Sequence, residues 1–531
     1  MNIGIAISKL RLGENLSQEK FAQKLNVTRQ AVQKWESGNA QPDIDNIIKI
    51  AKLFNTSVDS IVLSDDKRVS EILCEKKIQP AYNSIHDWEL YSSNLLTEYR
   101  QSVEEGKSIS QYEDLFKAVA KMQKGEQKET IADVLFNIVQ SSPQISGYKY
   151  NEPSDLIRIQ SLRPEFKYHT SEKINKIKLK DKILGAWIGR ICGCLLGKPI
   201  EGIKTNELHP ILKESKNFPM YRYIKSSDIT EKMTEECSFR MTGQCYADTI
   251  SFAPVDDDTN YTVLSNILVK TYGRDFTPCD VARIWSDYQP KNAYCTAERI
   301  AFCNFTNGFL PPDSAVYKNP YREWIGAQIR GDYFGYINPG NPELAADMAW
   351  RDASISHVKN GIYGEMFISA MIAYSAVNDS IEEIILGGIS QIPATSRIYE
   401  AVFELVDGFK NGTSEKDCLK KIHKRYNEHE SHDWCHTISN AMIVTAALLY
   451  GGNDYGKSIC MAVQAGFDTD CNGATVGSVL GMKNGSAYIP YEWTEPINGE
   501  LDTSIFGVGK VKIEDMAEAT MEHLSQTIFN K

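Results

Sequence analysis

Two short acidic segments carry residues that could bind metal ions. The first is the stretch 465–481, AGFDTDCNGATVGSVLG, in which Asp468 and Asp470 lie two positions apart. Residues i and i+2 do not share a helix face, so both carboxylates can face one point only where a turn leads into a helix. We therefore predict that Asp470 is the N-cap of the helix that follows. Taken alone, this segment is most simply a capped polar loop.

The second acidic segment consists of Asp256, Asp257 and Asp258, which precede a stretch with apolar residues at 263, 264, 267 and 268. If the two segments met, five carboxylates would repel one another strongly unless cations neutralised them. Oxygen ligands favour Mg²⁺, Mn²⁺ or Ca²⁺ over Zn²⁺. The two segments together indicate a site for two hard metal ions, which would acidify a bridging water molecule and clamp substrate oxygens.

A glycine-rich stretch could bring helices close enough to build such a site. Its glycines recur every four residues, at positions 185, 189, 193 and 197, and so share one helix face. In a membrane this pattern would indicate helix dimerisation. Because the segment is short for a span and contains Arg190, we predict instead a buried helix that packs backbone-close against another.

Length and composition describe a multidomain globular protein. A chain of 531 residues with 42% hydrophobic and 24% charged residues suggests roughly two to four domains. We expect no membrane segment, because apolar runs stay below about 18 residues, and no signal peptide, because Lys9 and Arg11 interrupt the N-terminus. The twelve cysteines form no CxxC pair, which favours the reduced cytoplasm.

Residues 1–64 differ from the rest of the chain in charge and pattern. They carry eight Lys or Arg and six Asp or Glu, whereas the whole chain has a net charge of −11. Short helices are predicted over 18–25, 29–36 and 44–54, with Ser17, Thr28 and Asp43 at their starts. We place the apolar face of the third at positions 44, 47, 48, 51 and 54. Two short helices joined by a tight turn are typical of a helix-turn-helix.

This segment resembles the XRE/Cro–C1 repressor-type helix-turn-helix family. The matching residues are Ser17-Gln18-Glu19, Val32-x-x-Trp35-Glu36-x-Gly38 and Pro42. The resemblance implies binding to two-fold operators as a homodimer, and Gln and Arg suit base reading because each can make two hydrogen bonds to one base edge. The DNA-facing residues would be Gln18, Arg29, Gln30, Gln33 and Lys34. A helical protein-interaction module is the alternative. Residues 65–180, which begin with a linker at 65–68, are predicted to be a helical connector or dimerisation region.

Residues 181–505 resemble the ADP-ribosylglycohydrolase family, of the DraG and ADP-ribosyl-acceptor hydrolase type. The match runs through Gly185-Ala-x-x-Gly-Arg-x-x-Gly-x-x-Leu-Gly-Lys-Pro-x-Glu-Gly202, the Asp-Asp-Asp-Thr at 256–259, Arg351-Asp-Ala-Ser-Ile-Ser-His-x-Lys-Asn-Gly-Ile-Tyr-Gly-Glu365, Trp434-x-His436-Thr-x-x-Asn440 and Gly466-Phe-Asp-Thr-Asp-Cys-Asn-x-Ala474. Residues 506–531 would add a C-terminal helix.

The resemblance implies an orthogonal all-α bundle that uses two Mg²⁺ or Mn²⁺ ions to cleave the glycosidic bond between ADP-ribose and an acceptor such as protein arginine. Carried over by position, the metal ligands are Asp256, Asp257, Asp258, Asp468, Asp470 and Cys471. The catalytic residues are Glu201, Asp257 and Asp470. The substrate-binding residues are Asp352, His357, Asn360, Gly361 and Tyr363. Asp256 replaces a frequent threonine, and Cys471 brings a thiol, which suits Mg²⁺ poorly.

Three further features complete the site hypotheses. Glycine-bearing stretches at 338–341 and 359–364 offer backbone N–H groups to a diphosphate. The aromatic residues Tyr333, Phe334 and Tyr336 would either stack on adenine or belong to the core. The cluster of His429, His432 and His436 with Asp433 has the residue types of a zinc site, although the sequence shows no fourth ligand.

The sequence thus predicts an all-α, cytoplasmic protein, nucleoid-associated when bound to DNA, in which a DNA-binding head is fused to an ADP-ribosylglycohydrolase-like body. The alternative is a transcription regulator whose body senses ADP-ribose or a related nucleotide without turnover. ADP-ribosylated DNA as the substrate is a third possibility, which the head suggests only by association.

Overall fold

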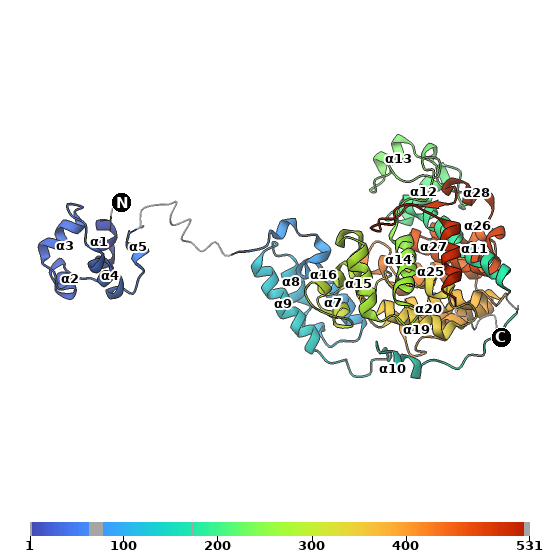
Figure 1. Ribbon diagram of the computed structural model, residues 1–531, viewed down its shortest axis with the longest axis horizontal. Helices are drawn as coiled ribbons and strands as arrows, with labels where there is room; N and C mark the ends of the chain where they lie inside the picture. The colour runs from blue at the N-terminus through green and yellow to red at the C-terminus, as the bar shows by residue number, and fades with distance from the viewer. Residues whose placement is uncertain (1–2, 63–77, 172–174, 525–531) are drawn as a thin grey trace. The chain divides into compact units, whose positions relative to one another are not determined.

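The computed structural model describes residues 3–62, 78–171 and 175–524. The chain forms two compact units, Met1–Ala81 and Tyr82–Lys531 (Figure 1). In the described residues the only strands are β1 (Glu500–Leu501) and β2 (Val511–Lys512), which pair antiparallel. The predicted all-α fold is therefore confirmed. From Tyr82 onward, the expected connector is part of the second unit, and the linker expected at 65–68 lies outside the described residues.

The first unit is a small helical bundle whose helices begin at the expected caps. It contains α1 (Ile3–Gly13), α2 (Gln18–Leu25), α3 (Arg29–Glu36), α4 (Ile44–Leu53) and α5 (Val58–Val62). The side chains of Ser17, Thr28 and Asp43 accept hydrogen bonds from backbone N–H groups in the first turns of α2, α3 and α4. Asn26, in the left-handed conformation, ends α2 and makes the tight turn to α3.

The core of this unit corrects one detail of the predicted pattern. Phe21, Val32 and Ile50 are fully buried, and together with their neighbours they hold the helices by apolar burial. The face of α4 is rotated from the predicted one, because Ile44 and Ile48 are exposed whereas Ile50 is buried. The helix itself was predicted correctly. Because several isoleucines follow one another, the sequence did not show that Ile50 would be the buried one.

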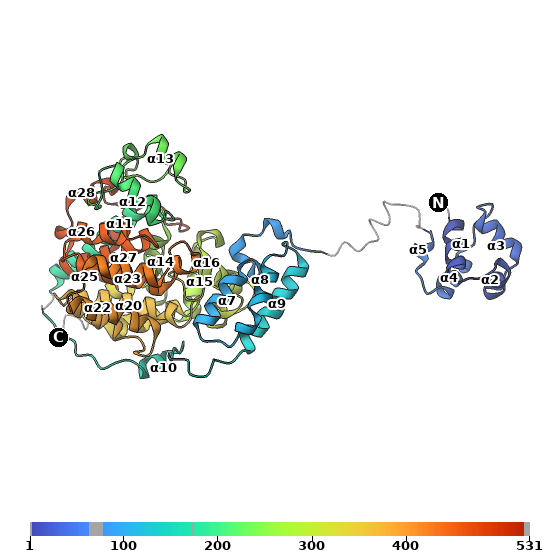
Figure 2. The same cartoon turned by 180° about the vertical axis from the view of Figure 1, so that it is seen from behind.

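The second unit begins with a small layer of helices that has its own apolar core. This layer contains α7 (Leu95–Glu104), α8 (Glu113–Ala120) and α9 (Glu126–Ser141). It is followed by α10 (Leu156–Ser161), which runs beneath the main body in Figures 1 and 2. Buried ion pairs join the layer to the body, among them Arg322 with Glu98 and Glu105 at 3.0 and 2.6 Å.

The centre of the body is the pairing of α11 (Lys176–Gly197) with α27 (Thr469–Asn484). The predicted glycine face of α11 meets a second glycine series on α27, at positions 473, 477 and 481. A Cβ on Gly189 would lie 2.2 Å from the carbonyl oxygen of Gly477, and one on Gly193 would lie 2.0 Å from that of Gly473. The two backbones are in direct contact, and only glycine fits between them.

The helix α11 is longer than predicted. The segment Lys176–Ile200 is long and apolar enough to cross a membrane by length and composition alone, yet 83% of its apolar 18-residue window is buried inside the protein. Its charged residue Arg190 is fully buried and bonded to protein groups. The backbone-close packing inferred from the glycine series is therefore confirmed.

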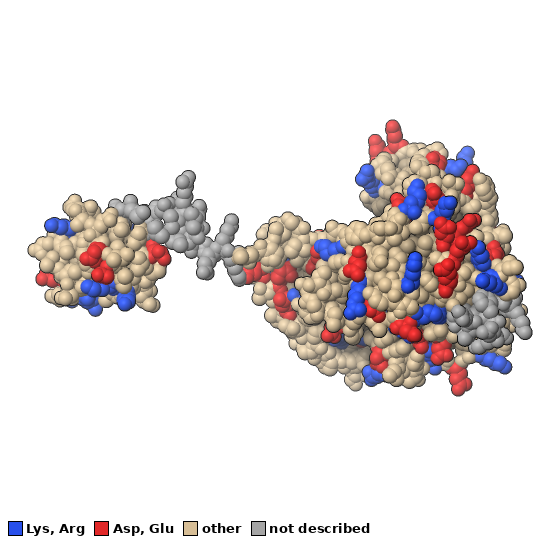
Figure 3. Space-filling model, viewed as in Figure 1, with Lys and Arg blue, Asp and Glu red and all other residues tan. Residues whose placement is uncertain are grey.

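The other helices surround this pair. On the face shown in Figure 3, acidic and basic side chains are interspersed over the second unit. The remaining helices are α12 (Thr205–Glu214), α13 (Glu231–Glu236), α14 (Asp257–Tyr272), α15 (Pro278–Tyr288), α16 (Thr296–Thr306), α17 (Asp313–Val316), α18 (Asp332–Tyr336), α19 (Pro342–Ala353), α20 (Asn360–Ser375), α21 (Ile381–Ile389), α22 (Arg397–Lys410), α23 (Glu415–Arg425), α24 (Ser431–Cys435), α25 (Thr437–Tyr450), α26 (Tyr455–Gln464), α28 (Tyr491–Thr494) and α29 (Ile513–Glu522).

Candidate metal centre

Three helix ends bring the predicted acids together. Glu201 follows the C-terminal end of α11, Asp256 precedes α14, and Asp468 precedes α27. A Cβ on Gly197 would lie 2.3 Å from the backbone nitrogen of Asp470, so the last glycine of α11 fixes the start of α27. In each of three groups of residues, the possible ligand atoms lie within 4.8 Å of one another. The groups are Glu201, Asp468 and Asp470; Asp258, Asp470 and Cys471; and Cys194, Asp256 and Asp258.

The start of α27 corrects the predicted cap. Asp468, not Asp470, is the N-cap residue, and its carboxylate makes no capping hydrogen bond. Asp470 lies in the first turn. Before Asp468 the chain passes through Gly466 and the buried Phe467, both at positive φ of 79° and 58°. This strained turn directs the acids towards α11 and α14 instead of back onto their own helix.

Asn440 of α25 holds this turn in place and was not predicted as a site residue. Its Oδ1 accepts hydrogen bonds from the backbone nitrogen of Asp468 at 3.2 Å and from Asn472 Nδ2 at 2.8 Å. Its Nδ2 donates to the carbonyl oxygens of Trp434 and His436. Asn440 is fully buried, so it acts as a clamp between the acidic turn and the segment before α25.

Two cations inside the group were also missed at the sequence level. Lys198 Nζ lies 2.7 Å from Asp256 Oδ2. Arg190 Nη2 lies 2.9 Å from Asp258 Oδ1, and Arg190 Nη1 lies 2.9 Å from Asp332 Oδ1. Both cations belong to the glycine-bearing segment, where each directly follows a glycine of the four-residue repeat. The repeat itself does not indicate which acids they contact.

The electrostatics of the group show an excess of negative charge. Burial, together with Asp256 and Asp470, raises the pKa of Asp257 to about 8. Repulsion from Asp470, with Asp257 and Asp256, raises the pKa of Glu201 well above its usual value. Burial and the neighbouring acids also raise the pKa of Asp258 and Asp468 well above theirs. The charged forms of these acids repel one another more than Lys198 and Arg190 can offset.

Two carboxylate oxygen atoms of this group are buried and lack a hydrogen-bond partner. Asp258 Oδ2 and Asp468 Oδ1 are buried without a hydrogen-bond partner, although their residues are 0% and 5% exposed. A buried carboxylate oxygen left unpaired is costly. Divalent cations would satisfy both atoms, so the residues present fit a metal centre.

The predicted substrate-binding residues lie elsewhere, in the core beside this group. Asp352 and His357 are 2% and 1% exposed, and Asp352 hydrogen-bonds Arg330. The remaining three, Asn360, Gly361 and Tyr363, lie in the wholly buried helix α20. All five residues are buried.

A buried charge cluster accounts for the position of Asp352. Arg330 lies 3.0 Å from Glu298 and 3.6 Å from Glu365. Burial raises the pKa of Glu298 to about 7, although Arg330 opposes the shift. Glu298 is near enough to contribute to the raised pKa of Asp257. This cluster therefore adds negative charge behind the metal centre.

The aromatic residues considered for adenine stacking are core residues. Tyr333, Phe334 and Tyr336 are 0% exposed, and the hydroxyl of Tyr336 bonds Ser478 on α27 at 2.7 Å. The adenine-stacking hypothesis was wrong, because the short helix α18 turns all three rings into the core. The hydroxyl of Tyr333 accepts from Asn266 on α14, and Phe334 stacks on Phe276.

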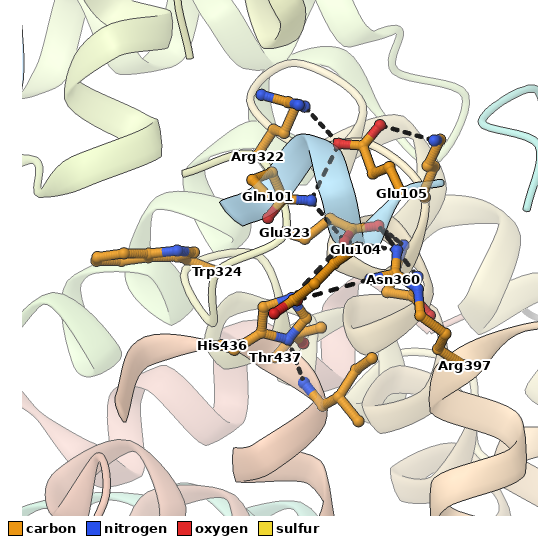
Figure 4. A network of polar contacts seen from close by, with 12 residues as sticks. Gln101, Glu104, Glu105, Arg322, Glu323, Trp324, Asn360, Arg397, His436 and Thr437 are labelled. Atoms are coloured by element: carbon orange, nitrogen blue, oxygen red, sulfur yellow. Dashed lines mark hydrogen bonds and ion pairs between the residues drawn. The ribbon is translucent and has the colours of Figure 1, made fainter. Parts of the chain in front are cut away.

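The histidines suspected of binding zinc belong to a different kind of network (Figure 4). His429 is exposed, whereas His432 and His436 surround Glu104. The Nδ1 atom of His432 accepts from Trp324 Nε1, and that of His436 accepts from the backbone nitrogen of Ile438. Each neutral ring must therefore carry its proton on Nε2, the atom that faces the carboxylates. The ligand atoms of Glu104, His432 and His436 also lie within 4.8 Å of one another, so these three residues are a second candidate metal group.

The predicted DNA-contacting residues divide into two groups. Arg29, Gln30, Gln33 and Lys34 are all exposed along α3. Gln18 is half-buried, and its Nε2 donates to Glu36 Oε2 at 2.7 Å. Arg11 holds the same carboxylate at 2.6 Å. Gln18 therefore ties α2 to α3 within the unit.

Comparison with known proteins agrees with the fold and the acidic site. The ADP-ribosylglycohydrolase family model matches residues 175–527. A helix-turn-helix family model matches residues 7–61. The family match supports a hydrolase of glycosidic bonds. The chain belongs to the ADP-ribosylglycohydrolase family and carries a helix-turn-helix domain at its N-terminus.

The curated relatives are helix-turn-helix regulators that match about a sixth of this chain. The chain is 31% identical over 87 residues to the HTH-type transcriptional activator BcrR of Enterococcus faecalis, which is 16% of this chain and 43% of that protein. It is 27% identical over 89 residues to the HTH-type transcriptional regulator ImmR of Bacillus subtilis (strain 168), which is 16% of this chain and 70% of that protein. A solved structure described as an ADP-ribosylglycohydrolase-related protein complex aligns with a TM-score of 0.41 at 18% identity, over 65% of this chain and 98% of that chain.

Proposed function

We propose that the second unit is a metal-dependent hydrolase that removes ADP-ribose from an acceptor, and that the first unit places it on specific DNA sequences. The observation that supports the hydrolase is the convergence of five carboxylates at three helix ends, with two buried oxygens left unpaired. Membership of the family supplies the reaction class. A DNA-bound hydrolase would work in the cytoplasm, at the nucleoid.

Each acid has a distinct role in this proposal. Two Mg²⁺ or Mn²⁺ ions, when bound, would neutralise the acids, hold vicinal ribose hydroxyls and acidify a water molecule. Asp258, Asp468 and Asp470 would hold the ions, with Asp470 common to two of the ligand groups. Asp257, which lies beside Asp256 and Asp470, would take the proton of the attacking water. Glu201, exposed at the rim, would orient substrate as the glycosidic bond loosens towards an oxocarbenium-like state.

The hydrolase is tested with ADP-ribosylated arginine peptide and Mg²⁺ or Mn²⁺. Intact protein should release free ADP-ribose, and Asp470→Asn should lower the rate by about 10²- to 10⁴-fold, the usual contribution of one positioned catalytic group. Asp454→Asn is a matched control, because Asp454 is an exposed N-cap residue for which Asn serves equally well. Release that is unchanged in Asp470→Asn would contradict the proposal.

The DNA-binding role rests on the exposed face of α3. A homodimer would place two copies of this helix in successive major grooves of a two-fold operator. Gln33→Ala and Arg29→Ala should each lower operator affinity by about 1–3 kcal/mol and leave thermal unfolding unchanged, because both side chains are exposed. Gel-shift titration measures the affinity. Sequence-selective binding that survives both changes would move the DNA contact away from α3.

A ligand sensor without turnover is the second candidate. The observation that favours it is the ion pair between Lys198 and Asp256, which removes one acid from the ligand set. A sensor would bind ADP-ribose tightly, release nothing from the peptide and change operator affinity when ADP-ribose is added. An enzyme would turn the peptide over without such a change. Calorimetry and gel shifts on the intact chain distinguish the two.

A further inference from the structure

One lysine at the edge of the acidic group is held by an aromatic ring and not by an acid. Lys204 is the residue before α12 and follows Glu201 by three positions. It is half-buried, and its Nζ lies 4.3 Å from the centre of the indole ring of Trp434 on α24. Within the described ranges, this nitrogen forms no hydrogen bond or ion pair. Its three N–H donors are therefore free for a ligand.

The indole that carries this lysine is tied to the acidic turn. Asn440 Nδ2 donates to the carbonyl oxygen of Trp434 at 2.9 Å, and Asn440 Oδ1 accepts from the backbone nitrogen of Asp468 at 3.2 Å. One amide therefore holds both segments. The indole Nε1 can only donate, and it is buried without an acceptor. The stacked pair of Lys204 and Trp434 thus has two kinds of unpaired donor, one of them charged.

The carboxylate that acts most strongly on Lys204 is that of Glu428, and other groups hold it. Its Oε1 accepts from the backbone nitrogen of Thr205 at 3.0 Å and from the hydroxyl of the same residue. A Cβ on Gly466 would lie 2.3 Å from its Oε2, so the carboxylate is confined between the start of α12 and the acidic turn. Burial lowers the pKa of Lys204, and Glu428 opposes this only in part. An anion beside the ammonium group would favour its charged form.

The two cations inside the acidic group are already paired. Lys198 is bonded to Asp256, and Arg190 is bonded to Asp258. A substrate that carries a diphosphate brings further negative charge to a group already rich in it, so its binding requires a cation that no carboxylate holds. Lysine commonly binds phosphate as a point charge. Lys204 has both the position and the free donors for this role.

We propose that Lys204, seated on Trp434, binds a phosphate group of the ADP-ribosyl substrate at the edge of the acidic group. The inference rests on the proposed function and goes further by assigning a side chain to the diphosphate. Trp434 positions the lysine, because the face of an indole attracts an ammonium group without using any of its N–H donors. The phosphate oxygens would accept hydrogen bonds from Nζ.

Calorimetric titration of the intact protein with ADP-ribose, in the presence of Mn²⁺, tests the inference. Lys204→Met should lower the affinity for ADP-ribose by about 10- to 100-fold, the effect of losing a hydrogen bond to a charged group. Lys204→Arg should keep most of the affinity, because arginine also stacks on aromatic rings and binds phosphate. Raising the ionic strength should weaken ADP-ribose binding less in Lys204→Met than in the intact protein.

A titration with Mn²⁺ alone distinguishes ligand binding from a structural role. Lys204→Met removes a positive charge near the acids, so its affinity for Mn²⁺ should be unchanged or higher. Damage to the fold would lower the affinities for Mn²⁺ and for ADP-ribose together. Lys213→Met is the matched control, because Lys213 lies on the same helix with its Nζ 5.0 Å from the ring centre of Phe218, and both residues are exposed. This control should bind ADP-ribose as the intact protein does.

The outcomes separate this inference from the proposed function. If intact protein binds ADP-ribose and Lys204→Met binds it equally well, the inference is overturned and the hydrolase is untouched. If Lys204→Met loses Mn²⁺ and ADP-ribose together and Lys204→Arg restores neither, the lysine is structural and the inference is again overturned. Intact protein that does not bind ADP-ribose would overturn both. Weaker ADP-ribose binding with retained Mn²⁺ binding and rescue by arginine would support the assignment, whether or not the peptide is hydrolysed.

Discussion

Two buried groups of charges in the second unit contain similar residues but are built differently. In the network of Figure 4, Arg397 Nη2 lies 2.7 Å from Glu323, and Asn360 and Gln101 donate to the same Glu323. Arg397 Nη2 also lies 2.9 Å from Glu152. In the metal centre, acids outnumber cations, and Asp258 and Asp468 keep unpaired oxygens. Paired charges fix a structure, whereas unpaired charges of one sign require a ligand.

Among changes to the network, we expect Arg397→Met to cause the largest loss of stability. Removing the guanidinium leaves Glu152 and Glu323 buried without their cation, which should lower the free energy of unfolding by about 3–5 kcal/mol. Chemical denaturation measures the change. Arg425→Met is the matched control, because Arg425 pairs with Glu404 at 3.8 Å on an exposed surface, where such pairs contribute about 0–1 kcal/mol. Equal losses of stability in both variants would mean that the buried network stabilises the fold no more than an exposed ion pair does.

The glycine pair should link stability to metal binding. In Gly477→Ala the new Cβ would lie 2.0 Å from the carbonyl oxygen of Gly189, so α11 and α27 must separate. Overpacking of this kind costs about 1–3 kcal/mol. Glu201 follows α11 and Asp470 lies on α27, so metal affinity should fall as well. By contrast, Arg397→Met should lower stability alone. Titration with Mn²⁺ checks this, and unchanged affinity in folded Gly477→Ala would contradict the coupling.

Removing a charge from the candidate metal centre should raise the free energy of unfolding, whereas removing Arg397 from the network lowers it. Without metal, Asp470→Asn removes one charge from a group of mutually repelling acids, so we expect the free energy of unfolding to rise by about 0.5–2 kcal/mol, the size of common stabilising changes. Asp454→Asn should leave it unchanged. Denaturation in the presence of a chelator measures both. A clear loss of stability in Asp470→Asn would mean that the acids are satisfied without cations.

The two groups should also give opposite pH dependences in metal-free protein. The folded pKa of Asp257 is raised to about 8, so its contribution to stability is complete below about pH 4 and is lost as the pH rises through 8. Burial alone would raise the pKa of Glu104, but His432, His436 and Arg100 lower it to about 2. Its contribution is present above about pH 4.5 and is lost as the pH falls towards 2. Thermal unfolding across this range should show both limbs, and saturating Mn²⁺ should flatten only the alkaline one.

The sequence predicted the parts of the site that depend on local rules. The glycine repeat on α11, the caps at Ser17 and Thr28, and the two acidic segments are patterns within single elements. Asn440 and the cations Lys198 and Arg190 were missed, because their roles depend on which helices meet. The matching glycines of α27 were present in the sequence at the same four-residue spacing, and that shared period could have paired the two helices.

The errors have the same origin. Asp470 has a good N-cap residue type, but the strained turn at Phe467 moves the helix start to Asp468. Tyr333, Phe334 and Tyr336 suit either a ligand or a core, and only the packing of α18 decides between them.

The central claim is that the unpaired acids, and not the paired network, bind divalent cations. Calorimetric titration of the intact protein with Mn²⁺ tests it most directly when Asp470→Asn is compared with Glu323→Gln. We predict that Asp470→Asn lowers the affinity by at least about tenfold and that Glu323→Gln, if folded, binds as the unmodified protein does. Affinity that is unchanged in Asp470→Asn, or lost in Glu323→Gln, would contradict this account.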